Sequence, residues 1–183
     1  MPDKTAETLA FTTHSPEDTI ALGRRLAVEL RPPMLVLLEG DLGAGKTTLT
    51  KGLVSGLGAA TEEEVTSPTF TLIHEYGVRP RAGARSGKAL RDIPGGSGGG
   101  TGSQPTRAEP PRVYHVDLYR IETARELDTL ALDDLLAENA VVIIEWGEKL
   151  GEALREALPP GRRLEIRITA PGDAERRIEL RTV

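Results

Sequence analysis

Residues Met34–Leu49 have the sequence MLVLLEGDLGAGKTTL. It opens with five apolar residues that follow two prolines and precede a glycine, a pattern that favours a short buried strand over a helix. Gly40–Thr47 then matches the phosphate-binding pattern G-x-x-x-x-G-K-[ST]. Leucines at 49, 53 and 57 continue at helical spacing as far as Gly58. The order strand, glycine-rich loop and helix therefore predicts a site for a nucleoside triphosphate.

Each part of this loop suits phosphate chemistry. Its glycines let successive backbone N–H groups point at phosphate oxygens, and the helix that follows adds its positive end. Lys46 is expected to reach the β- and γ-phosphates, and the Thr47 hydroxyl is expected to coordinate Mg²⁺. The expected nucleotide-binding residues are Asp41, Leu42, Gly43, Ala44, Gly45, Lys46, Thr47 and Thr48.

The sequence favours ATP over GTP as the nucleotide. Proteins that read guanine commonly use an Asn-Lys-x-Asp motif. The only asparagine here is Asn139, which is followed by an alanine and two valines. We therefore expect ATP and Mg²⁺ as the bound species.

Glu145 is the first candidate acid. It follows Val141–Ile144, a run of valine and isoleucine that predicts a buried strand. In parallel sheets, ligands bind at the carboxyl ends of the strands. Glu145 is therefore expected to face the Mg²⁺ and the γ-phosphate, where it would hold a metal-bound water or orient the attacking one.

Asp117 is the second candidate acid. On the alternating strand Val113–Tyr119 it shares one face with His115 and Tyr119. From the residues alone, a place in the metal shell and a half-exposed polar strand face are equally good interpretations. His115 and His74 lack the spacing of metal ligands, and we interpret them as structural. The candidate catalytic residues are Asp117, Glu145 and Lys46, and the candidate metal ligands are Thr47, Glu145 and Asp117.

Thr66–Thr69 lies between the helix after the loop and the next strand. Many nucleotide-hydrolysing proteins place a threonine there that senses the γ-phosphate. On spacing alone, a plain turn is the favoured interpretation.

The other elements predict an α/β fold of the P-loop NTPase type, with a mixed, mainly parallel sheet flanked by helices. Ser15-Pro16-Glu17-Asp18 has the cap, proline and acids of a helix start. The expected helices are the one that opens at Ser15, Thr123–Ala137 in one or two pieces, and Glu148–Leu158. The expected strands are Thr8–Thr13, Met34–Leu38, an antiparallel pair Phe70–Tyr76 and Val113–Tyr119, Ala140–Ile144, and a closing hairpin Arg163–Thr169 and Glu175–Thr182.

Arg79–Pro111 differs in composition from the rest of the chain. Thirteen of its 33 residues are glycine or proline, and it carries six Lys or Arg against two Asp or Glu. We expect a disordered surface insertion within one domain that spans residues 1–183. A basic arm or a lid that closes over phosphate is the alternative.

The bulk composition limits the remaining function classes. The chain has no cysteine, which excludes disulfides, thiolate metal sites and a cysteine nucleophile. No apolar run is long enough for a membrane span, and the N-terminal residues lack a signal pattern, so a cytoplasmic protein is expected. The net charge is −5, and residues outside Arg79–Pro111 carry −9, which argues against autonomous nucleic-acid binding.

Four motifs together resemble one family. They are the loop Gly40–Thr48, then Ser67–Leu72 with Glu75-Tyr76, then His115–Arg120, and then Ile144-Glu145-Trp146. In order and spacing they resemble the TsaE (YjeE) family of ATPases in bacterial tRNA modification. The resemblance covers nearly the whole chain, from Ser15 to Trp146. Arg79–Pro111 departs from it, because the family usually joins these strands by a short turn.

The resemblance implies a function and a set of partners. Such proteins hydrolyse ATP while threonylcarbamoyladenosine is made in tRNAs that read codons beginning with A. They act with TsaB-like and TsaD-like proteins, so tRNA would be met only through that complex. The family pattern implies Mg²⁺ binding at Thr47 and Glu145, a catalytic or metal-linked role for Asp117, and a switch-like role for Ser67–Thr71.

Two other functions remain open at this point. One is a small-molecule kinase that uses the arginine-bearing insertion as a lid. The other is a nucleotide-binding scaffold with little turnover. A kinase needs a pocket for the phosphate acceptor, and the sequence contains no motif for one.

Overall fold

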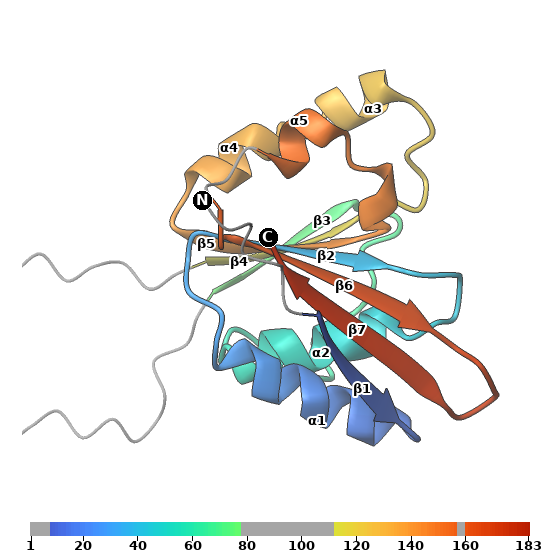
Figure 1. Cartoon of the computed structure of the whole chain (residues 1–183). Coiled ribbons are helices and arrows are strands. Elements are labelled where there is room, and N and C mark those ends of the chain that lie inside the picture. Colours follow the sequence, from blue (N-terminus) through green and yellow to red (C-terminus); the bar gives the residue numbers. More distant parts are fainter. Residues whose placement is uncertain (1–7, 78–111, 157–159) are drawn as a thin grey trace, which may run out of the picture.

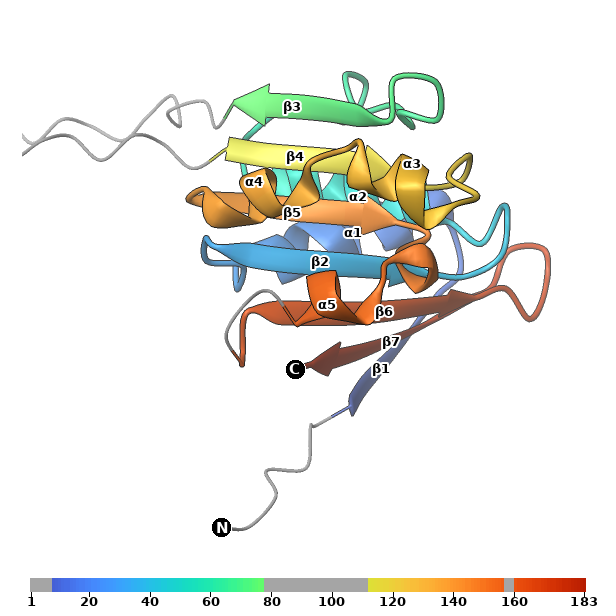
Figure 2. The same cartoon turned by 90° about the horizontal axis from the view of Figure 1, so that it is seen from above.

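A seven-stranded sheet lies at the centre of the computed structural model, which describes residues 8–77, 112–156 and 160–183. Helices α1 and α2 cover one face of the sheet, and α3, α4 and α5 cover the other (Figure 1). The strand order is β1-β7-β6-β2-β5-β4-β3, as seen from above in Figure 2. The strands are β1 (Thr8–Thr13), β2 (Met34–Glu39), β3 (Ile73–Gly77), β4 (Arg112–Asp117), β5 (Ala140–Glu145), β6 (Arg163–Thr169) and β7 (Arg176–Thr182). The helices are α1 (Pro16–Ala27), α2 (Lys46–Gly56), α3 (Ala124–Asp128), α4 (Leu132–Ala137), the 3₁₀ turn η1 (Gly147–Lys149) and α5 (Glu152–Arg155).

The sheet is mixed, as predicted, but it is not mainly parallel. Among the described strands, β6, β2, β5 and β4 form three parallel pairs. The pairs β1–β7, β7–β6 and β3–β4 are antiparallel. The expectation of a mainly parallel sheet is therefore wrong, because the closing hairpin and the two edge strands contribute as many antiparallel pairs as the centre contributes parallel ones.

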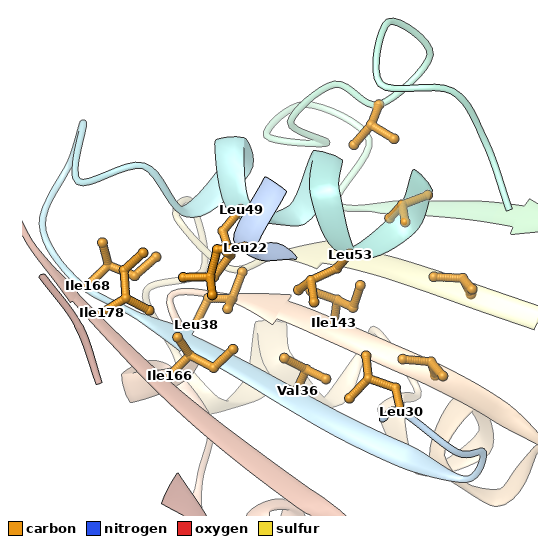
Figure 3. Close-up of a cluster of buried hydrophobic side chains, with 14 of the residues drawn as sticks. Leu22, Leu30, Val36, Leu38, Leu49, Leu53, Ile143, Ile166, Ile168 and Ile178 are labelled. Atoms are coloured by element: carbon orange, nitrogen blue, oxygen red, sulfur yellow. The ribbon is translucent and has the colours of Figure 1, made fainter. Parts of the chain in front are cut away.

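The central strands separate two hydrophobic cores. Alternate residues of a strand point to opposite faces, and in β5 every residue is buried. Val36, Leu38 and Ile143 face α1 and α2, where they meet Leu49 and Leu53 of α2 (Figure 3). Full burial of one such side chain contributes about 1.5–3 kcal/mol. This packing fixes α2, and with it the glycine-rich loop that precedes α2, against the sheet.

Helix α1 supports α2 from outside. Its start is as predicted: the Ser15 hydroxyl caps the helix by accepting from the Asp18 backbone N–H at 3.0 Å. Gly23 and Gly52 lie where the two helices cross. A Cβ on Gly23 would come 2.6 Å from the Leu49 carbonyl oxygen, and one on Gly52 would come 2.2 Å from the Ile20 carbonyl oxygen. The backbones therefore touch directly, and only glycine fits at either position.

Three expected elements differ from the structure, and the first is the strand expected over Val113–Tyr119: β4 spans Arg112–Asp117. Strand β3 begins at Ile73 rather than Phe70, because a turn closed by a 2.6 Å bond from the Leu72 N–H to the Pro68 carbonyl precedes it. The single helix expected over Glu148–Leu158 is wrong as well. Gly151 is extended, with φ −63° and ψ 156°, and it separates η1 from the short α5. Thr123–Ala137 forms two helices, one of the two expected arrangements.

All of Arg79–Pro111, with the lid or arm considered for it, lies outside the described residues. The nearest described residues on either side are paired: Gly77 ends β3 and is the register partner of Arg112, the first residue of β4. Over residues 8–77, 112–156 and 160–183, no helix has the length and apolar character needed to cross a membrane.

Candidate functional site

The glycine-rich loop Gly40–Thr47 joins the end of β2 to the start of α2. Gly40 has φ +144°, and a Cβ there would lie 2.3 Å from the Ile168 carbonyl oxygen, so the residue must be glycine. Gly45, with φ +108°, ends the loop in the left-handed region and caps α2. The first turn of α2 therefore points its free backbone N–H groups into the space beside the loop.

Lys46 is the first residue of α2 and is almost fully buried. Its Nζ donates to the carbonyl oxygens of Gly40 at 2.6 Å and Asp41 at 2.9 Å. The same Nζ lies 3.7 Å from the centre of the Trp146 ring, a cation–π contact. Burial lowers the pKa of Lys46, while the neighbouring acids Glu145, Glu148, Asp117 and Asp41 oppose that effect.

Asp117 and Glu145 end neighbouring parallel strands. The two residues are register partners, and each side chain is about 2% exposed. Glu145 Oε2 accepts from the Thr47 hydroxyl at 2.9 Å. Both candidate acids and the candidate Mg²⁺ ligand of α2 therefore meet at one edge of the sheet, as the sequence predicts for strand-end residues.

Asp117 is held by donors from a separate segment. Its Oδ2 accepts from the hydroxyls of Ser67 at 2.5 Å and Thr69 at 2.7 Å, and its Oδ1 accepts from the Tyr119 N–H at 2.9 Å. Spacing alone favours a plain turn for Thr66–Thr69. The structure instead brings two hydroxyls of this turn to a site carboxylate.

These residues surround a cavity of about 460 Å³, within the usual range for small-ligand sites. Six of the eight expected nucleotide-binding residues line it; Asp41 and Ala44 do not. Trp146 and Tyr119, whose ring centres are 5.2 Å apart, form part of its wall. The lining residues are Leu42, Gly43, Gly45, Lys46, Thr47, Thr48, Ser67, Thr69, Asp117, Tyr119, Glu145 and Trp146.

His115 is a neighbour of the site that the sequence analysis did not select. It is fully buried on β4, and its Nε2 lies 2.8 Å from Glu145 Oε1. The alternation of β4 places His115 on the face of Asp117, which was the available signal. Its contact with Glu145 joins residues 30 positions apart, and no local pattern encodes such a pair.

The oxygen atoms around the cavity suit a hard cation that is coordinated partly by the protein and partly by phosphate. Within the described part of the chain, no three His, Asp or Glu side chains are grouped so as to hold a metal by themselves. Mg²⁺ in nucleotide sites is commonly held by one or two protein oxygens together with phosphates and waters. Thr47 and Glu145 supply two oxygens of the appropriate kind.

The sequence and the fold both match known proteins. The sequence model of a family described as threonylcarbamoyl adenosine biosynthesis protein TsaE matches residues 13–83 and 103–178, leaving out 84–102 within the glycine-rich insertion. The tRNA threonylcarbamoyladenosine biosynthesis protein TsaE of Bacillus subtilis (strain 168) is 36% identical over 177 residues, which cover 96% of this chain and 86% of the relative. The protein of the same name from Streptomyces coelicolor is 38% identical over 154 residues, covering 83% of this chain and 80% of the relative.

A solved structure agrees with these sequence matches. The crystal structure of Bacillus subtilis YdiB superposes with a TM-score of 0.61 at 30% identity, and the match covers 99% of this chain and 89% of that one. The family match extends from Thr13 in β1 to Ile178 in β7 and includes the loop, both acids and the Ser67–Thr69 turn. The chain belongs to the TsaE family.

Proposed function

We propose that this chain is a Mg²⁺-dependent ATPase that supports threonylcarbamoyladenosine modification of tRNAs reading codons beginning with A. The observation that carries the proposal is the convergence of Lys46, Thr47 and Glu145 on one cavity at the start of α2. The names of the relatives support the pathway, since they concern tRNA threonylcarbamoyladenosine biosynthesis. We further propose a single cytoplasmic domain of the P-loop NTPase type, with an insertion at 79–111.

The loop and α2 would bind the triphosphate. The free N–H groups of the first turn of α2 attract anions. Lys46 has three N–H donors, of which two are directed at the carbonyls of Gly40 and Asp41. Its ammonium can therefore interact with phosphate oxygens from the position it already holds. A bound triphosphate would add negative charge beside Lys46 and so counter the lowering of its pKa by burial.

Thr47 and Glu145 would hold Mg²⁺. Asp117 would lie beside them, because it is the register partner of Glu145 on the neighbouring strand. The cation would neutralise charge on the phosphate oxygens as the terminal phosphoryl group is transferred. Asp117 and Glu145 offer carboxylate oxygens that can accept from water and orient it for attack. Because Ser67 and Thr69 donate to Asp117, the turn that carries them would respond to an occupied γ-phosphate position.

The isolated chain should hydrolyse ATP slowly. Among the described residues that line the cavity, Lys46 is the one Lys or Arg. Arg120 lies over the Phe70 ring at 4.5 Å, and Arg176 donates to three carbonyls of its own hairpin. An arginine supplied by a partner can raise such a rate by about 10³–10⁵. We propose TsaB-like and TsaD-like proteins as those partners, with tRNA bound through them, since this chain carries a net charge of −5.

The test compares ATP hydrolysis by the chain alone with hydrolysis in the presence of TsaB-like and TsaD-like proteins. Weak basal turnover, clear stimulation by the pair and no tight tRNA binding by the chain alone are expected. Equal turnover with and without the pair, together with phosphorylation of a small metabolite, would establish the kinase instead. Nucleotide binding without turnover under either condition would establish the scaffold.

A variant pair tests the site itself. Lys46→Ala removes the buried ammonium group at the cavity. Lys51→Ala, the control, removes an ammonium group from the next turn of the same helix. ATP affinity or turnover should fall at least about tenfold in the first variant, equivalent to about 1.4 kcal/mol. The second variant should match the native protein. Native ATP affinity and turnover in a folded Lys46→Ala protein would refute the nucleotide site.

A further inference from the structure

The two carboxylate oxygens of Glu145 have different neighbours. Oε2 accepts from the Thr47 hydroxyl at 2.9 Å, and Thr47 lines the cavity. Oε1 lies 2.8 Å from His115 Nε2 and 3.5 Å from the Thr50 hydroxyl. Both His115 and Thr50 are fully buried, and neither lines the cavity. One oxygen therefore belongs to the site, and the other is held from the protein interior.

His115 comes to Glu145 through the register of the central sheet. It pairs with Ile143 on β5, and Glu145 is the next residue of β5 on that same face. The strand pairing thus places the imidazole diagonally behind the carboxylate. His115 is fully buried, so its ring is enclosed by close-packed neighbours and held in place.

The partners of the two ring nitrogens of His115 determine which of them carries the proton. His115 Nδ1 is buried and finds no hydrogen-bond partner in the described part of the chain. An ionised carboxylate only accepts hydrogen bonds, so the 2.8 Å contact with Glu145 Oε1 needs a proton on Nε2, and in the neutral ring Nδ1 then carries only a lone pair. The proton therefore belongs on Nε2, which donates to Glu145 Oε1.

We infer that His115 is the positioning residue of Glu145: it holds Oε1 so that Oε2 is the oxygen offered to the cation beside Thr47. The inference rests on the proposed Mg²⁺-dependent function. A glutamate reaches its site through three rotatable bonds, and a bond to one oxygen fixes the last of them. Outer partners of this kind orient metal ligands and typically change metal affinity or activity by about 10–100-fold when removed.

The first test uses the full chain without nucleotide. Imidazole ¹⁵N–¹H NMR should show a proton on His115 Nε2, with a chemical shift that moves in Glu145→Gln and stays in place in Lys51→Ala. A proton on Nδ1 with none on Nε2, or an Nε2 signal that does not change in Glu145→Gln, would refute the contact. This arm needs no ligand, so it decides the His115–Glu145 contact even if the native protein fails to bind Mg²⁺ and ATP, a failure that would count against the proposed function alone.

The second test separates positioning from packing. His115→Leu replaces the imidazole with an apolar side chain of similar size and so removes the donor. His115→Gln retains an N–H group near the position of Nε2. Ile143→Val, at the register partner of His115, is the control for a small packing loss. Trp146 adjoins Glu145 and lines the cavity, so its fluorescence should report nucleotide binding as Mg²⁺ is titrated.

His115→Leu should require about tenfold or more Mg²⁺ for half-maximal nucleotide binding, and its kcat should fall more than its KM changes. Its nucleotide binding without Mg²⁺ should be native. His115→Gln should lie closer to the native protein, and Ile143→Val should equal it. Native Mg²⁺ dependence in His115→Leu would overturn the inference. If that variant fails to fold, His115→Gln decides, since a tenfold loss there despite the retained donor would also overturn it.

Discussion

Asp117 and Glu145 occupy equivalent positions on adjacent strands, yet their surroundings give them different partners. Glu145 interacts with the Thr47 hydroxyl at the cavity and with the fully buried Thr50 and His115. Asp117 accepts from Ser67 and Thr69, which belong to an exposed turn. Glu145 is therefore fixed relative to α2, whereas Asp117 is linked to the segment that leads to the exposed Phe70.

Replacing either acid by its amide should separate nucleotide binding from hydrolysis. Glu145→Gln and Asp117→Asn keep shape and remove a charge beside the proposed cation. We expect ATP still to bind, with turnover reduced at least about tenfold, or about 1.4 kcal/mol of barrier. Trp146 fluorescence measures binding and phosphate release measures turnover. The control is Glu156→Gln, an exposed acid outside the cavity; a loss of turnover there equal to that in the site variants would contradict the assignment.

Local sequence patterns were enough to select the loop residues and the acids at the strand ends as site candidates. Lys46 and Thr47 belong to a contiguous motif, and Glu145 follows its own buried strand. Ser67 and His115 were not selected from the residues, because their roles depend on partners 50 and 30 positions away. Such contacts are set by strand order, which short-range periodicity does not encode.

The contact between α1 and α2 holds α2 in position, and the glycine-rich loop leads directly into α2. Gly52 lies on α2 against the Ile20 carbonyl of α1, so added volume there must separate the two helices. Two effects of Gly52→Ala oppose one another. Alanine favours an exposed helix over glycine by about 1 kcal/mol. Overpacking of a tight contact costs about 1–3 kcal/mol, and a backbone atom 2.2 Å away cannot move like a flexible side chain.

We therefore expect Gly52→Ala to lower the free energy of unfolding by about 1–2 kcal/mol, measured by urea denaturation. Its matched control is Gly151→Ala, because Gly151 has φ −63° and no atom near the added Cβ. That variant should be native or slightly more stable. A stabilised Gly52→Ala protein would show that the two helices can move apart freely.

A second interaction between elements lies beneath the loop. Glu39, the last residue of β2, accepts from Arg155 of α5 at 3.0 Å and from Arg167 of β6 at 3.1 Å. Arg155 also donates to the Gly147 carbonyl at 2.7 Å, so it ties the start of the loop to the turn that follows Trp146. Burial alone would raise the pKa of Glu39, but its bonds to Arg155 and Arg167 outweigh burial, and the pKa lies below its ordinary value of 4.5.

This lowered pKa predicts a loss of stability in acid. The unfolded chain takes up the proton first, so Glu39 contributes fully above about pH 4.5, and its contribution disappears as the pH falls through the lower folded-state pKa. In Glu39→Gln, the free energy of unfolding should be lower at pH 7 and should fall less between pH 5 and strongly acidic conditions. Chemical denaturation across that range measures both. Parallel curves for the two proteins would contradict the interaction.

Regular periodicity accounts for the elements that were predicted correctly. The helix that opens at Ser15 and the strand that begins at Met34 each carry their own start signal and apolar pattern. The start of β3 was wrong for a local reason, and the helix expected over Glu148–Leu158 was wrong for a tertiary one. Leu72 adopts φ +66° in a turn held by Pro68, and Lys149 is drawn away from α5 by bonds to the carbonyls of Tyr119 and Ile121.

The residues next to the insertion lie at the end of β3 and β4 that is remote from the site. The insertion lies between Gly77 and Arg112, which are paired across β3 and β4. Asp117 is at the other end of β4, about 17–20 Å away for a strand of this length. In Figure 2 the end of β3 and the start of β4 lie on one side of the sheet, and the loop after β2 lies at the opposite ends of the strands. Deletion of the insertion tests the kinase alternative, which needs it as a lid, because 33 residues can span far more than this distance.

Deleting Arg81–Glu109 should leave basal ATP hydrolysis nearly native. Since Gly77 and Arg112 already face one another, the five remaining residues can join them. Closing a shorter loop costs less entropy, so stability should be equal or higher by roughly 1–2 kcal/mol. Thermal unfolding and phosphate release measure the two effects. A deletion variant that binds ATP and cannot hydrolyse it would restore the lid.

The complete burial of β5 between β2 and β4 has a consequence for backbone exchange with solvent. Amides of β2 and β5 should exchange hydrogen for deuterium only when the whole domain unfolds, because both strands are paired on both sides. The turn at Ser67–Thr69 and the exposed Phe70 should exchange through small local openings. Glu145 is thus attached to the slowest-exchanging backbone of the molecule, while the hydroxyls that hold Asp117 come from some of the fastest. Each local opening of this turn would remove the two hydroxyl donors of Asp117 Oδ2 and leave the contacts of Glu145 unchanged.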